Sequence, residues 1–248
     1  MNLTIDQGNT FTKIAVFEQD NCIKEFSISD SDIKGKLNEI FSTYKIENTI
    51  LSSVIHTSPE TIDLLTSKSK NFIQLNEHTP LPIKNLYKTP ATLGKDRIAV
   101  AVGANYLKPS TNVLVIDAGT TITYEFINAN GEYLGGNISP GMKMRFNSLH
   151  TFTKKLPLIE QTENLANADR WFDLLGNDTK SAILSGVING IIFEMDGYID
   201  TLKEKYADIN VFLTGGDTFF FENTLKNRTF AHKNLLSVGL NRILNYNA

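Results

Sequence analysis

The sequence lacks the features of secreted and membrane proteins. Its 248 residues include a single cysteine, Cys22, so no disulfide can form within one chain. No run reaches about 18 apolar residues, the length that spans a membrane. The most apolar stretch, residues 182–193, is interrupted by Ser185, Asn189 and two glycines. The first residues have neither the basic nor the apolar region of a signal peptide. We therefore expect a cytoplasmic protein.

Basic residues are not in excess either. Lys and Arg number 24 against 27 Asp and Glu, which gives a net charge of −3 and argues against a nucleic-acid-binding surface. The four histidines are scattered, without the spacing of metal ligands. Apolar residues make up 41% of the chain, so a chain of this length can bury a sizeable core without disulfides or structural metals.

One ten-residue segment occurs twice. Residues 3–12 read LTIDQGNTFT and residues 114–123 read LVIDAGTTIT, so six of ten positions are identical at an offset of 111. Core packing explains the shared Leu and Ile, but it does not require Asp and Gly at the same offset. A β-rich run precedes and follows each Asp-x-Gly, and turn signals such as Asn130-Gly131 come next. Each half of the chain is therefore expected to begin as strand, turn, strand, turn, strand.

The two Asp-x-Gly turns have the composition of a site for a polyphosphate and its metal ion. Each Asp places a carboxylate at a strand end, and the glycine lets backbone N–H groups approach an anion closely. Hydroxyl groups follow in both copies, and Lys13 adds a positive charge to the first. Phosphoryl transfer depends mainly on such positioning and charge neutralisation. One copy alone would be read as a structural turn, and neither copy matches the Walker or Rossmann glycine motifs.

The rest of the chain alternates between strand and helix patterns, which predicts an α/β protein. Strands are expected at residues 50–55 and 211–213, and helices at residues 33–44, 96–107 and 180–206. The composition of residues 108–112 is that of a linker, so we expect domains at 1–110 and 111–248.

A third glycine turn, Thr214-Gly215-Gly216-Asp217, could lie flat against a nucleotide or could be an ordinary turn after a strand.

Five motifs in order resemble those of type III pantothenate kinases, a family within the superfamily of acetate and sugar kinases, heat-shock chaperones and actin. The resemblance covers essentially the whole chain. The matching segments are Asp6–Lys13 (D-x-G-N-T-x-x-K), Gly94–Arg97 (G-x-D-R), Asp117–Thr120 (D-x-G-T), Gly131–Gly141 (G-x-x-x-G-G-x-I-x-P-G) and Asn177–Gly186, the last with one extra residue between Asn and Thr.

The resemblance implies two duplicated ribonuclease-H-like domains, as in actin-like ATPases, with an interdomain ATP cleft. It implies ATP-dependent phosphorylation of pantothenate to 4′-phosphopantothenate, the first step of coenzyme A biosynthesis. The implied cofactors are ATP, Mg²⁺ and a monovalent cation, K⁺ or NH₄⁺. The implied assembly is a homodimer whose substrate pocket is shared across the interface.

The resemblance also implies a role for individual residues. Asp96 would be the catalytic base, Asp117 would hold the monovalent cation, and Thr179 would reach the pantothenate pocket of the neighbouring subunit. Thr179 could instead cap a helix, and Asp96 could simply begin one. Glu125 stands where the family usually has Asp, which lengthens the reach of that carboxylate by one methylene and would change the geometry of the cation site if this carboxylate helps to organise it. The implied ATP-binding residues are Asp6, Gln7, Gly8, Asn9, Thr10, Phe11, Thr12, Lys13 and Thr120, and the implied pantothenate-binding residues are Tyr87, Gly94, Lys95, Asp96, Arg97 and Thr179.

Three other functions compete with this interpretation. A sugar kinase of the same superfamily would share the phosphate turns but not the Gly94–Arg97 segment, which sets the acceptor. A non-catalytic family member acting as an accessory to transcription would be expected to have lost Asp6, Lys13 or Asp96, and all three are present. A filament-forming or chaperone ATPase would carry large insertions, for which this chain is short.

Overall fold

The computed structural model describes residues 1–8, 11–29, 32–160 and 173–248. The described residues form two compact units. Unit 1 comprises residues 1–110, 130–134 and 234–248, and unit 2 comprises residues 111–129 and 135–233. The C-terminal segment therefore groups with the first residues of the chain, and the domain ranges 1–110 and 111–248 stay a prediction.

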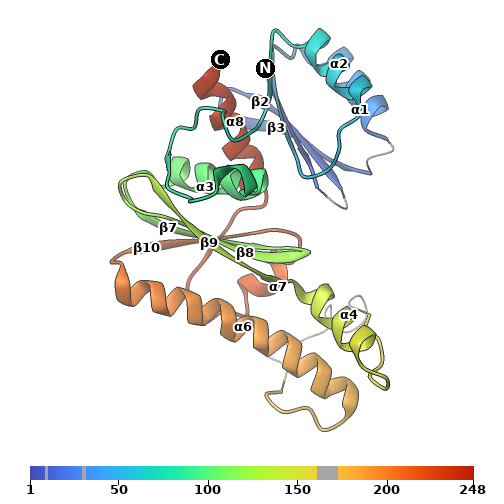
Figure 1. Cartoon of the computed structure of the whole chain (residues 1–248), viewed down its shortest axis with the longest axis vertical. Helices are drawn as coiled ribbons and strands as arrows, with labels where there is room; N and C mark the ends of the chain where they lie inside the picture. The colour runs from blue at the N-terminus through green and yellow to red at the C-terminus, as the bar shows by residue number, and fades with distance from the viewer. Residues whose placement is uncertain (9–10, 30–31, 161–172) are drawn as a thin grey trace. The chain divides into compact units, whose positions relative to one another are not determined.

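Unit 1 contains a mixed five-stranded sheet in the order β3-β2-β1-β4-β5. The repeat supplies its antiparallel hairpin, while β4 joins β1 in parallel after a helical crossover. Helices α1 and α2 lie together along this sheet (Figure 1). Their apolar residues, such as Leu37, Ile40 and Leu65, are buried with Leu3 and Ile5 of β1. The strands are β1 (Asn2–Gln7), β2 (Thr12–Glu18), β3 (Asn21–Ile28), β4 (Asn48–Ser53) and β5 (Asn71–Gln74), and the helices are α1 (Ile33–Thr43) and α2 (Pro59–Lys68).

The second sheet has six strands in the order β11-β10-β7-β8-β9-β6. Its central hairpin, β7 and β8, is the second copy of the repeat and pairs in the same antiparallel manner as β1 and β2. The strands are β6 (Lys84–Asn85), β7 (Asn112–Ala118), β8 (Thr121–Ile127), β9 (Glu132–Pro140), β10 (Ile209–Thr214) and β11 (Phe230–Ala231). The helices of unit 2 are α4 (Met142–Phe152), α6 (Thr179–Lys205) and α7 (Thr218–Glu222).

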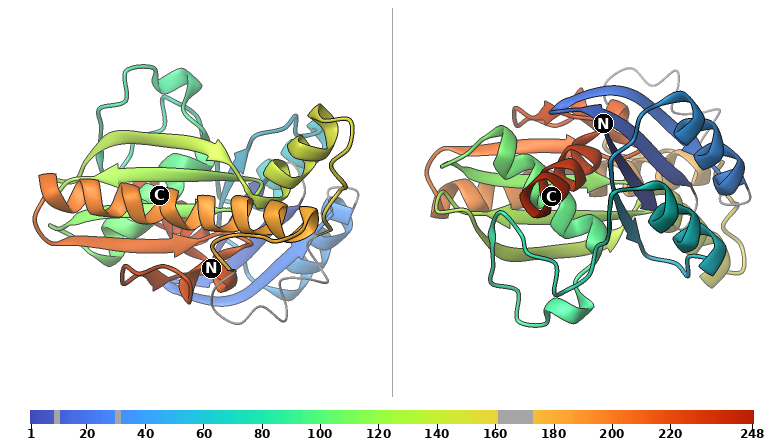
Figure 2. Two further views of the ribbon diagram at one scale, coloured as in Figure 1. Left: turned by 90° about the horizontal axis from the view of Figure 1, so that it is seen from below. Right: turned by 90° about the horizontal axis from the view of Figure 1, so that it is seen from above.

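Helix α6 runs along one face of β7, β8 and β10 (Figures 1 and 2). Among the described residues it is the one helix long and apolar enough to cross a membrane by length and composition. However, 61% of its most apolar window is buried inside the structure. Ile188, Ile191, Met195 and Ile199 are at most 1% exposed in the core of unit 2. The apolar character of α6 is therefore accounted for by packing against its own sheet.

Two helices of unit 1 cross at unusually close range. They are α3 (Lys95–Leu107), preceded by the short 3₁₀ helix η2 (Pro90–Thr92), and α8 (Leu235–Asn247). A Cβ added to Gly239 would lie 1.8 Å from the carbonyl oxygen of Ala99, and one added to Gly103 would lie 2.4 Å from that of Leu235. Only glycine at both positions lets the two backbones approach this closely. This contact fixes α3, whose first turn carries Asp96.

The predicted strands and helices are present, with ends shifted by up to a few residues. Both repeats form strand–turn–strand hairpins, as predicted. The helices predicted at residues 33–44, 96–107 and 180–206 are α1, α3 and α6. Helices α2, α4, α7 and α8 were not predicted.

Candidate active site

The first candidate phosphate-binding turn joins β1 to β2 in unit 1. Asp6 lies opposite Lys13 in the ladder, and Gln7 lies opposite Thr12. The backbone N–H of Gly8 donates to the carbonyl of Phe11 at 3.2 Å, which closes the turn. Of the predicted ATP-binding residues, Asn9 and Thr10 lie outside the described residues.

The carboxylate of Asp6 is held at the mouth of this hairpin. Asp6 is 8% exposed, and the hydroxyl of Ser52 on β4 donates to its Oδ1 at 3.0 Å. The side chain of Gln7 accepts a hydrogen bond from Thr57, so its amide oxygen is already engaged within unit 1. Phe11 is 56% exposed at the tip of the turn.

The second candidate turn joins β7 to β8 in unit 2 and is one residue shorter than the first. Asp117 lies opposite Thr123, and the N–H of Gly119 donates to the carbonyl of Thr121 at 3.0 Å. Thr120 is exposed at the tip. Gly141 supports the turn, because its N–H donates to the carbonyl of Thr120 at 3.1 Å. A Cβ on Gly141 would lie 2.1 Å from the carbonyl oxygen of Gly119, so the Pro-Gly end of the Gly131–Gly141 motif fits against this turn only as glycine.

The third glycine turn lies beside the second phosphate turn. Thr214, at the end of β10, pairs with Asp117 of β7. Gly215 has a φ of 98°, and a Cβ there would lie 2.4 Å from Oδ1 of Asp117 and 2.3 Å from the carbonyl oxygen of Ala118. The N–H of Asp217 donates to that carbonyl at 2.9 Å, and burial raises the pKa of the Asp217 carboxyl. Gly215 thus packs closely against a cradle formed by these two oxygen atoms beside the second turn.

Glu125 lies deeper in unit 2 than its predicted role at a cation site would suggest. It is fully buried on β8, opposite Val115 and two residues beyond Thr123. A Cβ on Gly136 would approach its Oε2 to 2.9 Å, so the carboxylate faces the neighbouring strand β9. Its predicted contribution to the cation site stays a prediction.

Four of the residues predicted to bind pantothenate lie at the N-terminal end of α3. Gly94 precedes the helix, and the carboxylate of Asp96 folds back so that its Oδ1 accepts the N–H of Arg97 at 2.8 Å. A Cβ on Gly94 would lie 2.5 Å from that oxygen, which explains the glycine of the G-x-D-R motif. Asp96 therefore lies in the first turn of a helix and is also partly accessible. The helix terminus stabilises a negative charge there.

Arg97 is packed against two tyrosines. The side chain of Arg97 is 6% exposed, its Nη2 donates to the hydroxyl of Tyr133 at 3.4 Å, and its Cζ lies 5.7 Å from the ring centroid of Tyr87. The two rings are 6.2 Å apart. Tyr87 and Arg97, predicted to bind pantothenate, are thus brought together. Tyr133 was missed, since its position within the Gly131–Gly141 motif gives no signal of contact with residue 97.

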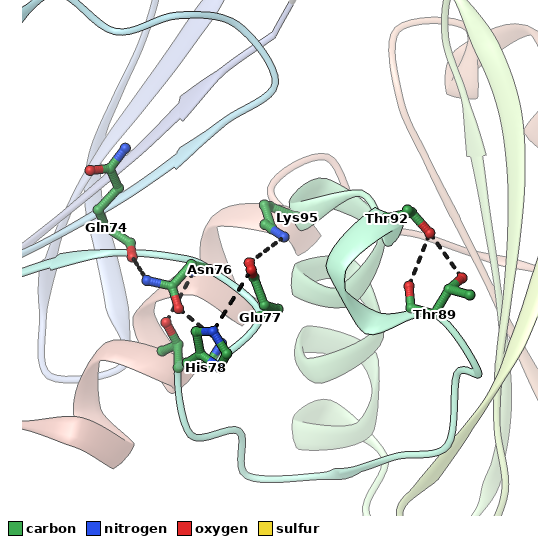
Figure 3. Close-up of polar contacts among 8 residues, drawn as sticks. Gln74, Asn76, Glu77, His78, Thr89, Thr92 and Lys95 are labelled. Atoms are coloured by element: carbon green, nitrogen blue, oxygen red, sulfur yellow. Dashed lines mark hydrogen bonds and ion pairs between the residues drawn. The ribbon is translucent and has the colours of Figure 1, made fainter.

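Two ion pairs hold the loop that carries Tyr87. Figure 3 shows the Lys95 ammonium pointing toward Glu77, with Nζ and Oε2 3.6 Å apart. The same loop pairs with β9, where Lys84 Nζ lies 2.9 Å from Oε1 of Glu132. Lys95 is therefore engaged with the protein, and its ion pair joins the segment that follows β5 to the start of α3.

Thr179 is the first residue of α6, and it is not the helix cap. Asp178 holds that position, because its carboxylate accepts the N–H of Ser181 at 3.0 Å while the Ser181 hydroxyl accepts the N–H of Asp178. The alternative interpretation of Thr179 as a cap is therefore wrong. Thr179 instead lines a groove of about 650 Å³ in unit 2. Its other lining residues are Arg145, Ser148, Leu149, Leu156, Ala182, Ile183, Gly186 and Val187.

Comparison with solved structures defines the class of protein first. The chain matches an activator of 2-hydroxyisocaproyl-CoA dehydratase from Clostridium difficile with a TM-score of 0.56 at 14% identity, covering 99% of this chain and 93% of that one. It also matches a polyphosphate/ATP-glucomannokinase from Arthrobacter (TM-score 0.53, 11% identity, 99% and 98% coverage). A conserved candidate transcriptional activator of the Baf family from Campylobacter jejuni gives a TM-score of 0.62 at 24% identity, with 99% and 98% coverage. The fold is that of actin-like ATPases and sugar kinases.

The sequence comparisons then give the family. The family model for type III pantothenate kinase matches residues 2–201. The chain is 47% identical over 247 residues to the type III pantothenate kinase of Phocaeicola vulgatus, covering 100% of this chain and 99% of that one. It is 43% identical to that of Bacteroides fragilis strain ATCC 25285, with 100% and 98% coverage. This chain belongs to the type III pantothenate kinase family, and it phosphorylates pantothenate with ATP in coenzyme A biosynthesis. The sugar-kinase likeness is one of fold alone.

Proposed function

We propose that the two hairpin turns bind the phosphates of ATP during pantothenate phosphorylation. The observation that supports this most strongly is a feature that the two hairpins share. Each has an Asp at the strand end and a turn closed by a glycine N–H, at Gly8 and at Gly119. In this proposal residues 6–13 and Thr120 are the residues that bind the phosphates. Backbone N–H groups and Lys13 then neutralise the charge of the transferring phosphoryl group.

The proposed chemistry at the acceptor uses the start of α3. Asp96 accepts the proton of the primary hydroxyl of pantothenate while that oxygen bonds to the γ-phosphorus and the bond to ADP breaks. Arg97 binds the pantothenate carboxylate, a task suited to its planar guanidinium group. Tyr87, Gly94 and Lys95 complete the acceptor site. The contacts of Arg97 with Tyr87 and Tyr133 support this, because they fix the guanidinium in advance.

We also propose metal sites at the two repeated carboxylates. Carboxylate and carbonyl oxygens suit hard cations, and the cradle beside Gly215 presents Oδ1 of Asp117 and the carbonyl of Ala118. Asp117 holds the monovalent cation, K⁺ or NH₄⁺, and Asp6 faces the Mg²⁺ that accompanies ATP. A bound cation would neutralise phosphate charge.

Replacing Asp117 with Asn should abolish stimulation by K⁺. We expect kcat of the unaltered enzyme to rise about tenfold or more when K⁺ replaces Na⁺ at constant ionic strength, and Asp117→Asn to respond less than about twofold. Coupled ATP assays in each salt measure this, with Asp63→Asn on the surface of α2 as a matched control. If Asp117→Asn kept the full stimulation by K⁺, the proposal that Asp117 holds the monovalent cation would be wrong.

We further propose a homodimer in which Thr179 enters the pantothenate site of the partner subunit. The exposed side of α6 supports this, because Gly186, Gly190 and Gly197 have open space where a Cβ would point. Glycine inside a helix costs about 1 kcal/mol relative to Ala. Among the described residues, no packing requires these three, so close approach of a second chain is the reason we propose for them. Phe193, 58% exposed, and the groove beside Thr179 extend the same surface.

Mixing two inactive variants tests the shared site. Asp96→Asn removes the base of one subunit, and Thr179→Arg blocks the site that Thr179 enters. In a co-expressed heterodimer, one of the two sites would combine an intact Asp96 with an intact Thr179. We expect roughly one active site per mixed dimer. Purified heterodimers should therefore have about half of the activity of the dimer formed by two unaltered chains. If each chain built its own site, the mixture would stay inactive, and that result would overturn the shared pocket.

We place the reaction in the cytoplasm, in keeping with the metabolic role of the family.

A further inference from the structure

The carboxylate of Glu194 on α6 gathers donors from three other elements of unit 2. The hydroxyl of Tyr124 on β8 donates to its Oε1 at 2.8 Å, and that of Ser139 on β9 donates to the same oxygen at 2.5 Å. Nη2 of Arg145 on α4 lies 2.5 Å from Oε2. The side chains of Arg145 and Glu194 are only 21% and 23% exposed, so solvent screens this pair less than it would a surface pair.

This cluster is connected to the second phosphate turn through three consecutive residues. Ser139 binds Glu194 directly, and Nε of Arg145 donates to the carbonyl of Pro140 at 2.8 Å. The next residue, Gly141, donates its N–H to the carbonyl of Thr120 and packs directly on the turn. Displacement of residues 139–141 would therefore displace Thr120.

We infer that Glu194, acting through Arg145 and Ser139, is a positioning residue that holds the second turn in the shape that binds ATP. The inference rests on the proposed contact of Thr120 with phosphate. Glu194 itself touches neither the turn nor the phosphate. It fixes the β9 end that supports the turn, and its helix α6 is anchored on the sheet core by Ile188 and Ile191.

The charge of Glu194 is suited to this task. Burial is the largest influence on the pKa of its carboxyl and raises it, but hydrogen bonds from Ser139, Arg145 and Tyr124 together hold the pKa below its usual value. Glu194 is therefore ionised at neutral pH. Burial and, after it, the same carboxylate raise the pKa of Tyr124, so that its hydroxyl stays a donor.

Glu194→Gln keeps the shape of the side chain but removes the charge opposite Arg145. We expect the KM for ATP to rise roughly tenfold while the KM for pantothenate changes less than about twofold. Titration calorimetry with a non-hydrolysable ATP analogue should show the same weakening without turnover. The matched control is Asp200→Asn, which removes a more exposed ion pair, with Lys226, from the same helix.

Thr120→Ala separates failure of this inference from failure of the proposed phosphate contact. If Thr120→Ala weakens ATP binding and Glu194→Gln does not, Glu194 has no positioning role although the contact stands. If neither variant weakens ATP binding, the contact itself is wrong. An equal rise of both KM values in Glu194→Gln, or conversion to a monomer in sedimentation, would also overturn the inference, since it would show general damage.

Discussion

Asp96→Asn should lower kcat about a thousandfold while leaving the fold intact, since general-base catalysis typically contributes 10²–10⁴-fold. Asn can still accept the N–H of Arg97 through its Oδ1, as Asp96 does at 2.8 Å. The start of α3 therefore keeps its geometry. The negative charge at the helix terminus is lost, which costs about 0.3–1 kcal/mol of stability. Single-turnover and steady-state assays measure the rate, and thermal melting measures the stability.

The control for this variant is Glu60→Gln. Glu60 also lies in the first turn of a helix, α2, and is exposed away from the acceptor residues. Its replacement should cost similar stability and leave kcat unchanged. If Asp96→Asn kept its kcat, the aspartate would have only the role of a helix-terminal charge and could not be the base.

Gly239→Ala should destabilise the protein severely. The new Cβ would lie 1.8 Å from the carbonyl oxygen of Ala99 and 2.9 Å from the backbone nitrogen of Gly103. These are backbone atoms of a helix, so the two helices must separate. Overpacking of this kind costs about 3 kcal/mol or more, which lowers the melting temperature by about 10 °C in a chain of this size. Since α3 carries Asp96 and Arg97, the KM for pantothenate should rise as well.

Gly35→Ala is the matched control, because Gly35 is also helical but has open space at its Cβ position. This change should stabilise the protein by about 0.5–1 kcal/mol, the helix propensity difference between the two residues. Scanning calorimetry of both variants compares the effects. A melting temperature unchanged by Gly239→Ala would show that α3 and α8 can separate without cost.

Local patterns in the sequence were sufficient for the phosphate turns and the main helices. The repeat predicted both hairpins because Asp, Gly and the flanking strands lie within about ten consecutive residues. The start of α3 was predicted for the same reason. Contacts between distant segments left no such pattern. Nothing in the sequence of residues 235–247 indicates that they pack on α3. Likewise, nothing in the sequence around Tyr133 indicates that its hydroxyl accepts a hydrogen bond from Arg97. Asp178, the true cap of α6, was not predicted because the neighbouring Thr179 is also a residue type that caps helices.

Motif glycines divide into two kinds that sequence alone could not distinguish. Gly94, Gly141 and Gly215 face oxygen atoms within 2.6 Å of where a Cβ would be, so their smallness is required by the chain itself. Gly186, the last residue of another motif, faces open space. The difference depends on three-dimensional neighbours, which the sequence does not give.

The grouping of α8 with unit 1 has a consequence for how the protein is made. Asn2 on β1 donates to Asn241 and Asn245 of α8, and Asn247 donates to the carbonyl of Pro80. The residues of α8 are synthesised after residues 1–233, so the first 110 residues leave the ribosome well before the helix that completes their unit. The face of α3 that α8 covers must remain exposed during that interval. The nascent chain is then open to aggregation or chaperone binding until α8 has been made.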